Sequence, residues 1–273
     1  MGLKSFGRLN LEKQKRVIYY SDELNDDFAG TNIKKQRKVG ERFRYVHYGL
    51  LWNIIASVLY WGIAFWIFWI YQVVFKRVKI VNKKAIRKTK MGRFFYGNHT
   101  SIDDAYKPGL ISAPRQNRVL ANPDAVSIKG LANFVQMLGV IPVPNEFSGM
   151  KKFVKAIKHY NKFKYDIFIY PEAHIWPYYT GVRPFVDGSF YYPVLLNKPV
   201  YAFFTAYTEP KGMFAKFRKA NATIYISEPF YPDQTKSRKE AQKELRDKVY
   251  NFMKECSEKY STYKAVEYVK IEK

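Results

Sequence analysis

The sequence contains almost no cysteine. Cys256 is the single cysteine among 273 residues, which excludes an intramolecular disulfide and any metal site built from several cysteines. A count this low is compatible with a catalytic domain that faces the cytoplasm. The length suffices for one α/β domain together with a modest membrane-attachment region.

Acidic residues are scarce as well. The chain has 23 Asp and Glu against 47 Lys and Arg, so its formal net charge is +24. A field of this sign attracts polyanions, and the two large ones are nucleic acid and an anionic bilayer. Since the sequence has no RNP-like stretch, zinc finger or helix-turn-helix signature, we expect anionic membrane lipids as partners and no nucleic acid.

One long segment contains no charge at all. Residues 49–75 read GLLWNIIASVLYWGIAFWIFWIYQVVF, and about 20 apolar residues are enough for a helix to cross the hydrocarbon core. The segment begins too late in the chain, and is too long, to be a secretory signal. Its Trp and Tyr residues are spread along the whole length, which indicates a segment lying at the membrane interface or dipping into it.

Basic residues flank this segment on both sides. Residues 31–48 carry six basic residues and one acid, and residues 76–93 carry nine basic residues and no acid. The positive-inside rule would keep both flanks cytoplasmic, which a single span cannot satisfy but a re-entrant helical hairpin bent near Gly62 can. A plain transmembrane helix and burial in a soluble core are the alternatives.

These features divide the chain into three parts. Residues 1–48 form a basic N-terminal segment, residues 49–75 a membrane-embedded helix or re-entrant hairpin, and residues 76–273 an α/β domain. We expect the protein at the cell membrane, with the α/β domain on the cytoplasmic face.

From residue 76 onward the pattern alternates strands with helices, which predicts an α/β fold with a mixed, mostly parallel sheet flanked by helices. The expected strands are residues 78–81, 93–97, 140–143, 166–170, 200–206 and 223–227. The expected helices are residues 128–138, a helix capped by Ser148, and residues 235–259.

Only four histidines are available as a general base near neutral pH. We expect His47, in the basic flank, and His159, at a helix end, to lie at the surface. His174 is expected to line the site. His99 directly follows the apolar strand 93–97, at a strand end of the kind where α/β domains bind ligands.

A carboxylate lies within reach of His99. Ser101 and Asp104 have the spacing of a capping box, so we expect a helix to begin at Ser101. With His99 in the turn before it, Asp104 can accept one ring N–H and leave the other nitrogen free as a base. Such a pair suits direct attack by a substrate hydroxyl. A structural histidine that caps the helix is the alternative.

Several motifs follow one another in a recognisable order. They are N-H-x-S-x-x-D at Asn98–Asp104, Gly139–Pro144, Tyr170-Pro171-Glu172, Arg183-Pro184-Phe185 with Gly188-Ser189-Phe190, and Leu195–Phe203. Over about residues 76–230 this series resembles the glycerolipid acyltransferase family, whose best-known members acylate lysophosphatidate. The apolar segment before the first motif is also a feature of that family.

The resemblance implies transfer of a fatty acyl group from an acyl thioester, either acyl-CoA or acyl-carrier protein, to lysophosphatidate. The product would be phosphatidate, in phospholipid biosynthesis. His99 would deprotonate the acceptor hydroxyl and Asp104 would hold the imidazole, with no acyl-enzyme, no metal and no cofactor. Glu172 would orient the site or the acceptor, or else cap a helix. Asn98, Ser101, His174 and Gly188 complete the expected substrate-binding residues.

The chain also departs from the family pattern. Asn145 occupies the position where the second motif usually ends in Arg, and residues 173–175 read Ala-His-Ile where the third motif usually continues with Gly, Ser or Thr, and Arg. A phosphate needs cationic or N–H donors, and the nearest replacements in sequence are Lys151, Lys152 and Arg183. The two lysines lie near an expected helix N-terminus, which favours anions. A solvated helix face is the alternative for both.

Three functions remain open on these grounds. The first is acyl transfer to lysophosphatidate. The second is acyl transfer to another lysophospholipid, a glycolipid or an amino-lipid, because the two family arginines are missing. The third is a non-catalytic membrane-association protein that uses only its basic and apolar surfaces.

Overall fold

A mixed seven-stranded sheet forms the centre of the computed structural model, which describes residues 16–29, 33, 35–213 and 215–272. In spatial order its strands are β2 (Lys79–Val81), β8 (Asn221–Ile226), β7 (Val200–Thr208), β3 (Arg93–Gly97), β6 (Asp166–Ile169), β4 (Asn117–Ala121) and β5 (Val140–Pro142). The only antiparallel pair in this sheet is β7 with β8, and the other five pairs are parallel. The predicted fold class is therefore confirmed.

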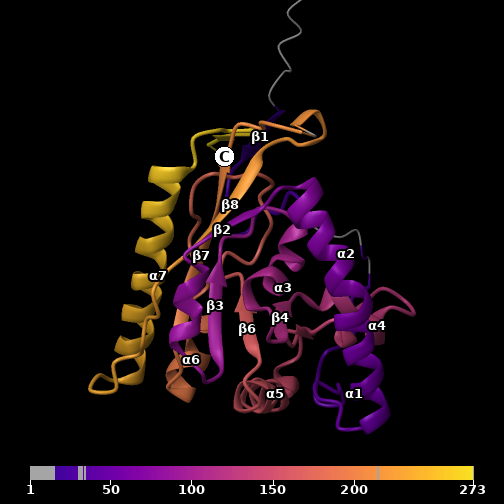
Figure 1. Ribbon diagram of the computed structural model, residues 1–273. Coiled ribbons are helices and arrows are strands. Elements are labelled where there is room, and N and C mark those ends of the chain that lie inside the picture. The colour runs from indigo at the N-terminus through magenta and orange to yellow at the C-terminus, as the bar shows by residue number, and fades with distance from the viewer. Residues whose placement is uncertain (1–15, 30–32, 34, 214, 273) are drawn as a thin grey trace, which may run out of the picture.

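Helices cover both faces of the sheet (Figure 1). The α-helices of the domain are α3 (Lys107–Ser112), α4 (Ala132–Met137), α5 (Met150–Lys162), α6 (Tyr191–Leu196) and α7 (Arg238–Tyr260). Short 3₁₀ turns lie at Lys83–Lys88, Ile102–Ala105, Pro123–Val126, Phe147–Gly149, Asp187–Phe190 and Ala215–Phe217. Both faces are buried because the central strands are apolar on both sides: in β3, Phe94 and Tyr96 pack toward α5, α6 and α7, whereas Phe95 packs toward α3.

The uncharged segment forms one continuous helix of 26 residues, Leu50–Phe75. It consists of α1 (Leu50–Ser57), a π-helical stretch (Val58–Ala64), α2 (Phe65–Ile70) and a second π-helical stretch (Tyr71–Phe75). The hairpin expected to bend near Gly62 is therefore wrong. Gly62 does not take up the positive φ of a turn, and the segment has neither proline nor charge to interrupt the helical hydrogen bonds.

This helix lies along the domain (Figure 1). The Tyr60 hydroxyl accepts a hydrogen bond from Asn117 Nδ2 at 2.6 Å, Phe68 stacks on Tyr106 with ring centroids 4.0 Å apart, and the Tyr71 hydroxyl donates to Asp103 Oδ1 at 3.2 Å. The opposite face is uncovered, and only 11% of the most apolar 18-residue window is buried. By length and composition it is the one helix in the described part of the chain that could cross a membrane.

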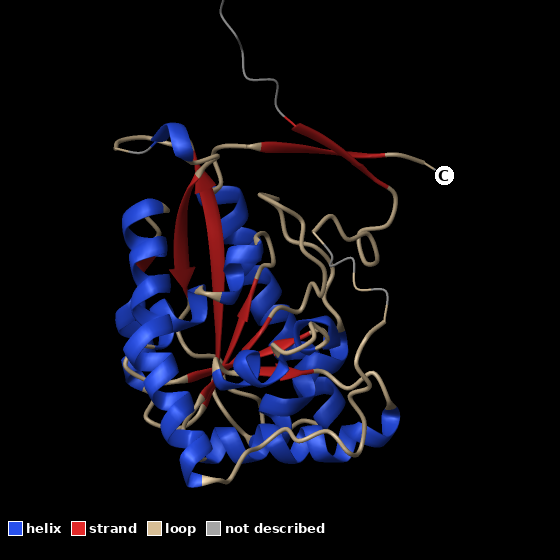
Figure 2. Ribbon diagram, turned by 90° about the vertical axis from the view of Figure 1, so that its right-hand side faces the viewer, coloured by secondary structure: helices blue, strands red, loops and turns tan. Residues whose placement is uncertain are grey.

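The two ends of the described chain form a separate two-stranded ribbon. β1 (Arg16–Tyr20) pairs in parallel with β9 (Val266–Lys270), and Figure 2 shows this ribbon apart from the main sheet. Its side chains pack on Trp176, which stacks against Tyr268 with centroids 5.0 Å apart and meets Tyr20 edge-on at 4.7 Å. The N-terminal segment is thus attached to the loop that follows β6.

Most predicted elements are present, with shifted ends. The six expected strands correspond to β2, β3, β5, β6, β7 and β8, and the long C-terminal helix is α7, which begins after a capping box formed by Ser237 and Glu240. The helix expected over residues 128–138 is only six residues long, Ala132–Met137, and the helix expected from Ser148 begins at Met150. The helix expected from Ser101 is a 3₁₀ turn, Ile102–Ala105, followed by α3. Strands β1, β4 and β9 and helix α6 were not predicted.

Candidate functional site

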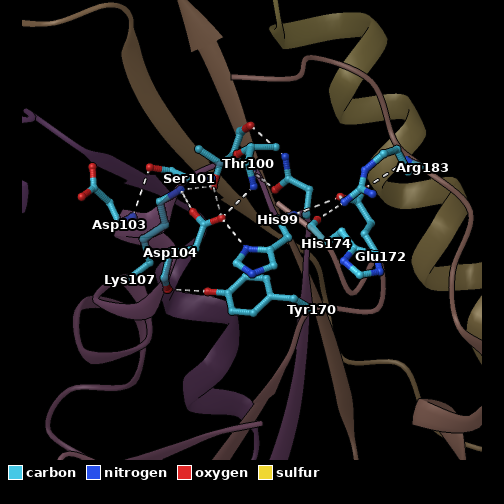
Figure 3. Close-up of polar contacts among 12 residues, drawn as sticks. His99, Thr100, Ser101, Asp103, Asp104, Lys107, Tyr170, Glu172, His174 and Arg183 are labelled. Carbon is cyan, nitrogen blue, oxygen red and sulfur yellow. Dashed lines mark hydrogen bonds and ion pairs between the residues drawn. The ribbon is translucent and has the colours of Figure 1, made fainter. Parts of the chain in front are cut away.

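The candidate site lies where two neighbouring parallel strands end. β3 ends at Gly97 and leads into Asn98 and His99, while β6 ends at Ile169 and leads into Tyr170. Because the two strands are hydrogen-bonded neighbours that run in the same direction, the residues that follow them meet at one edge of the sheet. Figure 3 shows the resulting cluster around the His99 ring.

His99 and Asp104 are in direct contact. His99 Nδ1 lies 3.0 Å from Asp104 Oδ2, and the backbone N–H groups of Thr100 and Ser101 donate to the same oxygen at 2.7 and 2.9 Å. The capping box predicted at Ser101 is present and turns Asp104 back toward His99. Since an ionised carboxylate can only accept hydrogen bonds, Nδ1 carries the proton and Nε2 keeps a lone pair. The arrangement gives this imidazole the form of a base.

A buried lysine completes the environment of Asp104. Lys107 Nζ forms an ion pair with Asp104 Oδ1 and donates to Thr205 Oγ1 at 3.0 Å, and the side chains of Lys107 and Asp104 are 3% and 0% exposed. Burial opposes ionisation of Asp104, but the charge of Lys107 and the hydrogen bond from His99 outweigh it and lower the pKa of the carboxyl group to about 2. Asp104 is therefore an anion over the whole physiological pH range.

Tyr170 holds the His99 ring from one side. The two rings stack with centroids 4.5 Å apart at an angle of 20°, and the Tyr170 hydroxyl donates to the Asp104 backbone carbonyl at 2.6 Å. The same residue therefore touches both members of the pair. Full burial raises the pKa of Tyr170 well above its usual value, so its hydroxyl remains a donor.

A second buried ion pair lies behind His99. Glu172 Oε2 accepts hydrogen bonds from the His99 backbone N–H at 3.1 Å and from Arg183 Nη2 at 3.2 Å, and Glu172 Oε1 accepts one from the Arg183 backbone N–H at 3.1 Å. Burial raises the pKa of Glu172, and the Arg183 charge opposes that rise. Glu172 therefore fixes the backbone of His99 and the course of the loop up to Arg183.

The backbone donors next to His99 are already occupied. The N–H groups of His99, Thr100 and Ser101 all donate to the buried carboxylates of Glu172 and Asp104. An oxyanion formed near His99 would consequently have to be met by other donors.

The loop after Glu172 closes over the backbone of His99. The Trp176 N–H donates to the His99 carbonyl at 3.1 Å and the Tyr178 N–H donates to the Thr100 carbonyl at 2.9 Å. Ala173 adopts a φ of 63° in this loop, a left-handed conformation that favours glycine.

The other residues predicted from the sequence have varied positions. Asn98 is fully buried and joins β3 to β7: its Oδ1 accepts from the Thr205 N–H at 2.8 Å and its Nδ2 donates to the Thr205 carbonyl at 3.2 Å. His174 is partly exposed beside the site, and its Nδ1 lies 3.5 Å from Asp27 Oδ2. Arg183 is fully buried against Glu172 and Trp176. Its guanidinium therefore does not face solvent as a phosphate ligand would.

Three predicted residues lie apart from this cluster. Lys151 and Lys152 are exposed on α5, which packs against β6 and α6. Gly188 lies exposed in the 3₁₀ turn Asp187–Phe190, and a side chain there would meet no atom within 4 Å. The contacts of the described residues do not connect these three with His99.

Sequence reasoning missed two residues that touch the pair. Lys107 lies three positions after Asp104, the spacing at which helical neighbours meet, and this was the available signal. Tyr170 was recognised only as part of a motif, and nothing in the sequence indicates that its ring covers His99.

Comparison with known proteins supports the fold. No protein-family model and no curated protein matches this sequence. Among solved structures, the chain is similar to the 1-acyl-sn-glycerophosphate (LPA) acyltransferase PlsC of Thermotoga maritima, with a TM-score of 0.50 and 15% sequence identity. The match covers 78% of this chain and 96% of that one. At this identity the likeness shows a shared acyltransferase-like fold.

Proposed function

We propose that this protein is an O-acyltransferase of the lysophosphatidate type. It would transfer a fatty acyl group from an acyl thioester to the free hydroxyl of lysophosphatidate and thereby make phosphatidate. The observation that carries this proposal is the His99 imidazole, whose Nδ1 is bound to the buried carboxylate of Asp104 at 3.0 Å. No serine or cysteine side chain in the described part of the chain hydrogen-bonds to that ring, so a base acting directly on the substrate hydroxyl is favoured over an acyl-enzyme.

The chemistry follows from this geometry. Nε2 of His99 takes the proton of the acceptor hydroxyl as the oxygen attacks the thioester carbonyl. The tetrahedral intermediate then expels the thiolate, the C–S bond breaks, and the imidazolium returns its proton to the sulfur. Asp104 stabilises the transient imidazolium and keeps the ring in the correct tautomer. The balance needs only the two substrates, with acyl-CoA or acyl-carrier protein as donor.

The apolar helix would bring this site to the lipid. Lys76, which directly follows the helix, forms an ion pair with Asp103 at 2.9 Å, and Asp103 is next to Asp104 in sequence. The charged domain cannot enter the hydrocarbon core, and it contacts the helix along its length, with α4 against α1, Asn117 at Tyr60 and Asp103 at Tyr71. We therefore infer that the helix lies in the plane of the interface with its uncovered face in the lipid. The cytoplasmic face of the cell membrane, with its anionic lipids, suits the charge of +24.

One observation favours a different acceptor within the same reaction class. Asn145 stands at the position of a family arginine, and its side chain is hydrogen-bonded to the N-terminal segment. Its Oδ1 accepts from the Val39 N–H at 2.8 Å and its Nδ2 donates to the Arg37 carbonyl at 3.1 Å. The Arg183 guanidinium forms a buried ion pair with Glu172. An acceptor with a headgroup other than a phosphate monoester is therefore the second candidate.

The test is acyl transfer in lipid vesicles with a radiolabelled acyl thioester, supplied as acyl-CoA or as acyl-carrier protein. The acceptors are lysophosphatidate, lysophosphatidylglycerol, lysophosphatidylethanolamine and lysophosphatidylcholine. We expect labelled phosphatidate from the wild type and from Lys239→Ala, an exposed substitution on α7, and none from His99→Ala. Transfer to another acceptor would support the second candidate. Undiminished transfer by His99→Ala would refute the role of His99 as the base. If the wild type transfers the acyl group to none of these acceptors, a non-catalytic membrane-association protein is favoured instead.

A further inference from the structure

A cavity of about 250 Å³ lies at the start of the apolar helix, between α1, β4 and the end of α5. Its polar lining includes Arg118, His47, His159 and Gln136, and Trp52 of α1 forms part of its wall. We refer to it as the α1 pocket. The two histidines that the sequence placed at the surface are half-buried here.

The α1 pocket is separate from the candidate acyl-transfer site. Arg118 is the second residue of β4. Its neighbour Asn117 pairs with Asp166 at the start of β6, and Asp166 pairs with Arg93 at the start of β3. His99 follows the other end of β3. The pocket and His99 therefore lie at opposite ends of the strands, more than about 13 Å apart along the strand direction.

The pocket holds a fixed cation. The Arg118 guanidinium lies over the rings of Tyr160 and Tyr165, 4.5 and 4.2 Å from their centroids, and Nη1 donates to the Asn117 carbonyl at 2.9 Å. Arg118 Nε is buried and has no acceptor among the described residues. A guanidinium held in place by two rings has already lost much of its rotational freedom. Binding of an anion therefore costs little further side-chain entropy.

The surrounding charges have the same sign. None of the residues that line the pocket is acidic. Burial and then Arg44 lower the pKa of His47, and burial, Arg118 and Lys162 lower the pKa of His159. Both imidazoles are therefore held toward the neutral form, in which the ring N–H of His159 can donate to an anion, whereas the N–H of His47 donates to Gln136 Oε1. His47 is also positioned by stacking on Trp52 with centroids 3.7 Å apart and by a 3.1 Å contact between its Nε2 and Gln136 Oε1.

We propose that the α1 pocket is an anion site that binds the phosphate group of an anionic lipid headgroup. The chemistry is that of a guanidinium fork supported by the ring N–H of His159, which matches phosphate oxygens. The lipid source is indicated by the exposed apolar side chains of α1 beside the pocket, among them Leu51 and Ile55, along which acyl chains would lie. Free inorganic phosphate offers the same oxygens and is distinguished by experiment.

The experiment observes the four histidines by NMR, in full-length protein carrying labelled histidine. One arm adds inorganic phosphate to protein in detergent micelles. The other compares nanodiscs of phosphatidylcholine with nanodiscs that also contain phosphatidylglycerol. We expect saturable shifts of the His47 and His159 signals in both arms. Arg118→Gln should weaken the affinity at least tenfold, as expected for losing a charge-assisted hydrogen bond. Lys151→Gln also removes one positive charge, but at an exposed position, and this variant should bind the anion as the wild type does.

The outcomes decide the proposal without any measurement of acyl transfer. Shifts that are equally strong in Arg118→Gln, or absent from the wild type in both arms, would overturn it. A response to phosphate alone would overturn the lipid assignment. If Arg118→Gln fails to fold, His159→Gln at a partly exposed helix position replaces it: unchanged affinity monitored at His47 would then refute the pocket. Because His99 lies at the other end of the strands, the acyltransferase proposal can fail or succeed independently.

Discussion

Replacing Lys107 by Met tests how the buried charges around His99 are balanced. The change removes the ammonium that pairs with Asp104 and Thr205 while keeping an apolar chain of similar length. Asp104 would remain fully buried and lose its only cationic side-chain partner among the described residues apart from His99. Removing one partner of a buried ion pair costs about 3–5 kcal/mol, because the other charge stays uncompensated.

The pKa of Asp104 reflects the same interaction together with the effects of burial and of His99. Its value of about 2 lies below the usual 3.8, and such a shift corresponds to about 2–3 kcal/mol. Since the folded-state pKa is lowered, this stabilisation is fully present above pH 4 and is lost as the pH falls toward 2. Lys107→Met should therefore shift the acid loss of stability to higher pH.

Thermal unfolding in detergent measures the effect. For a domain of this size we expect Lys107→Met to lower Tm by roughly 10 °C at pH 7. The double variant Lys107→Met with Asp104→Asn removes both charges and should recover much of that loss. Lys151→Met, an exposed lysine, should stay within about 2 °C of the wild type. A Lys107→Met protein as stable as the wild type, or a double variant whose loss equals the sum of the single losses, would refute the argument.

Three further predictions concern catalysis and the membrane. Asp104→Asn should lower kcat at least a hundredfold with little change in acceptor KM, because it affects the base; a change mainly in KM would contradict this. Tyr170→Phe keeps the stacked ring and loses the hydroxyl bond to Asp104, so kcat should fall roughly fivefold, and an unchanged kcat would show that the bond is irrelevant to turnover. Trp66→Glu with Ile70→Glu on the uncovered face of the helix should abolish flotation with anionic vesicles; flotation that persists in high salt would refute the interfacial assignment.

The sequence predicted the strands at residues 93–97 and 166–170, and their parallel pairing in the structure brings His99 next to Tyr170. Residues 93–97 and 166–170 are short apolar runs, each followed by polar residues, and such runs are typical of buried parallel strands. In the structure they are β3 and β6, paired from Arg93 with Asp166 onward. His99 and Tyr170 are consequently neighbours although 71 positions separate them.

The missed elements lack a local signal. β4 reads Asn-Arg-Val-Leu-Ala and its first two residues are polar, yet it lies between β6 and β5. Asn117 is buried there because Tyr60 of the apolar helix meets its side chain. Lys107 belongs to the same class: a lysine is usually exposed, and only the fold brings the Thr205 hydroxyl of β7 to its ammonium. The spacing of Lys107 from Asp104 can be read from the sequence, but tertiary partners such as Tyr60 and Thr205 cannot.

The helical hairpin was inferred from a correct observation and an assumption that does not apply. Both flanks are basic, and the positive-inside rule then forbids a single crossing. The rule describes segments that cross the bilayer, however, and a helix lying in the plane of the interface has both ends on the same side without bending. The contacts of Tyr60, Phe68 and Tyr71 with the domain support the in-plane orientation that we propose, since a perpendicular helix would carry the domain into the hydrocarbon.

An in-plane helix also explains why the basic flanks lie where they do. One flank precedes α1 beside the α1 pocket, and the other begins at Lys76, whose ion pair with Asp103 joins the helix end to the turn that carries Asp104. Both ends would then rest on headgroups, and the His99 edge of the sheet would be held at the depth where a lysophospholipid presents its hydroxyl. If the helix is detached from the domain by Lys76→Ala with Tyr71→Phe, we expect acceptor KM in vesicles to rise severalfold while hydrolysis of a water-soluble thioester changes little. Equal effects on both reactions would show that the contact only stabilises the fold.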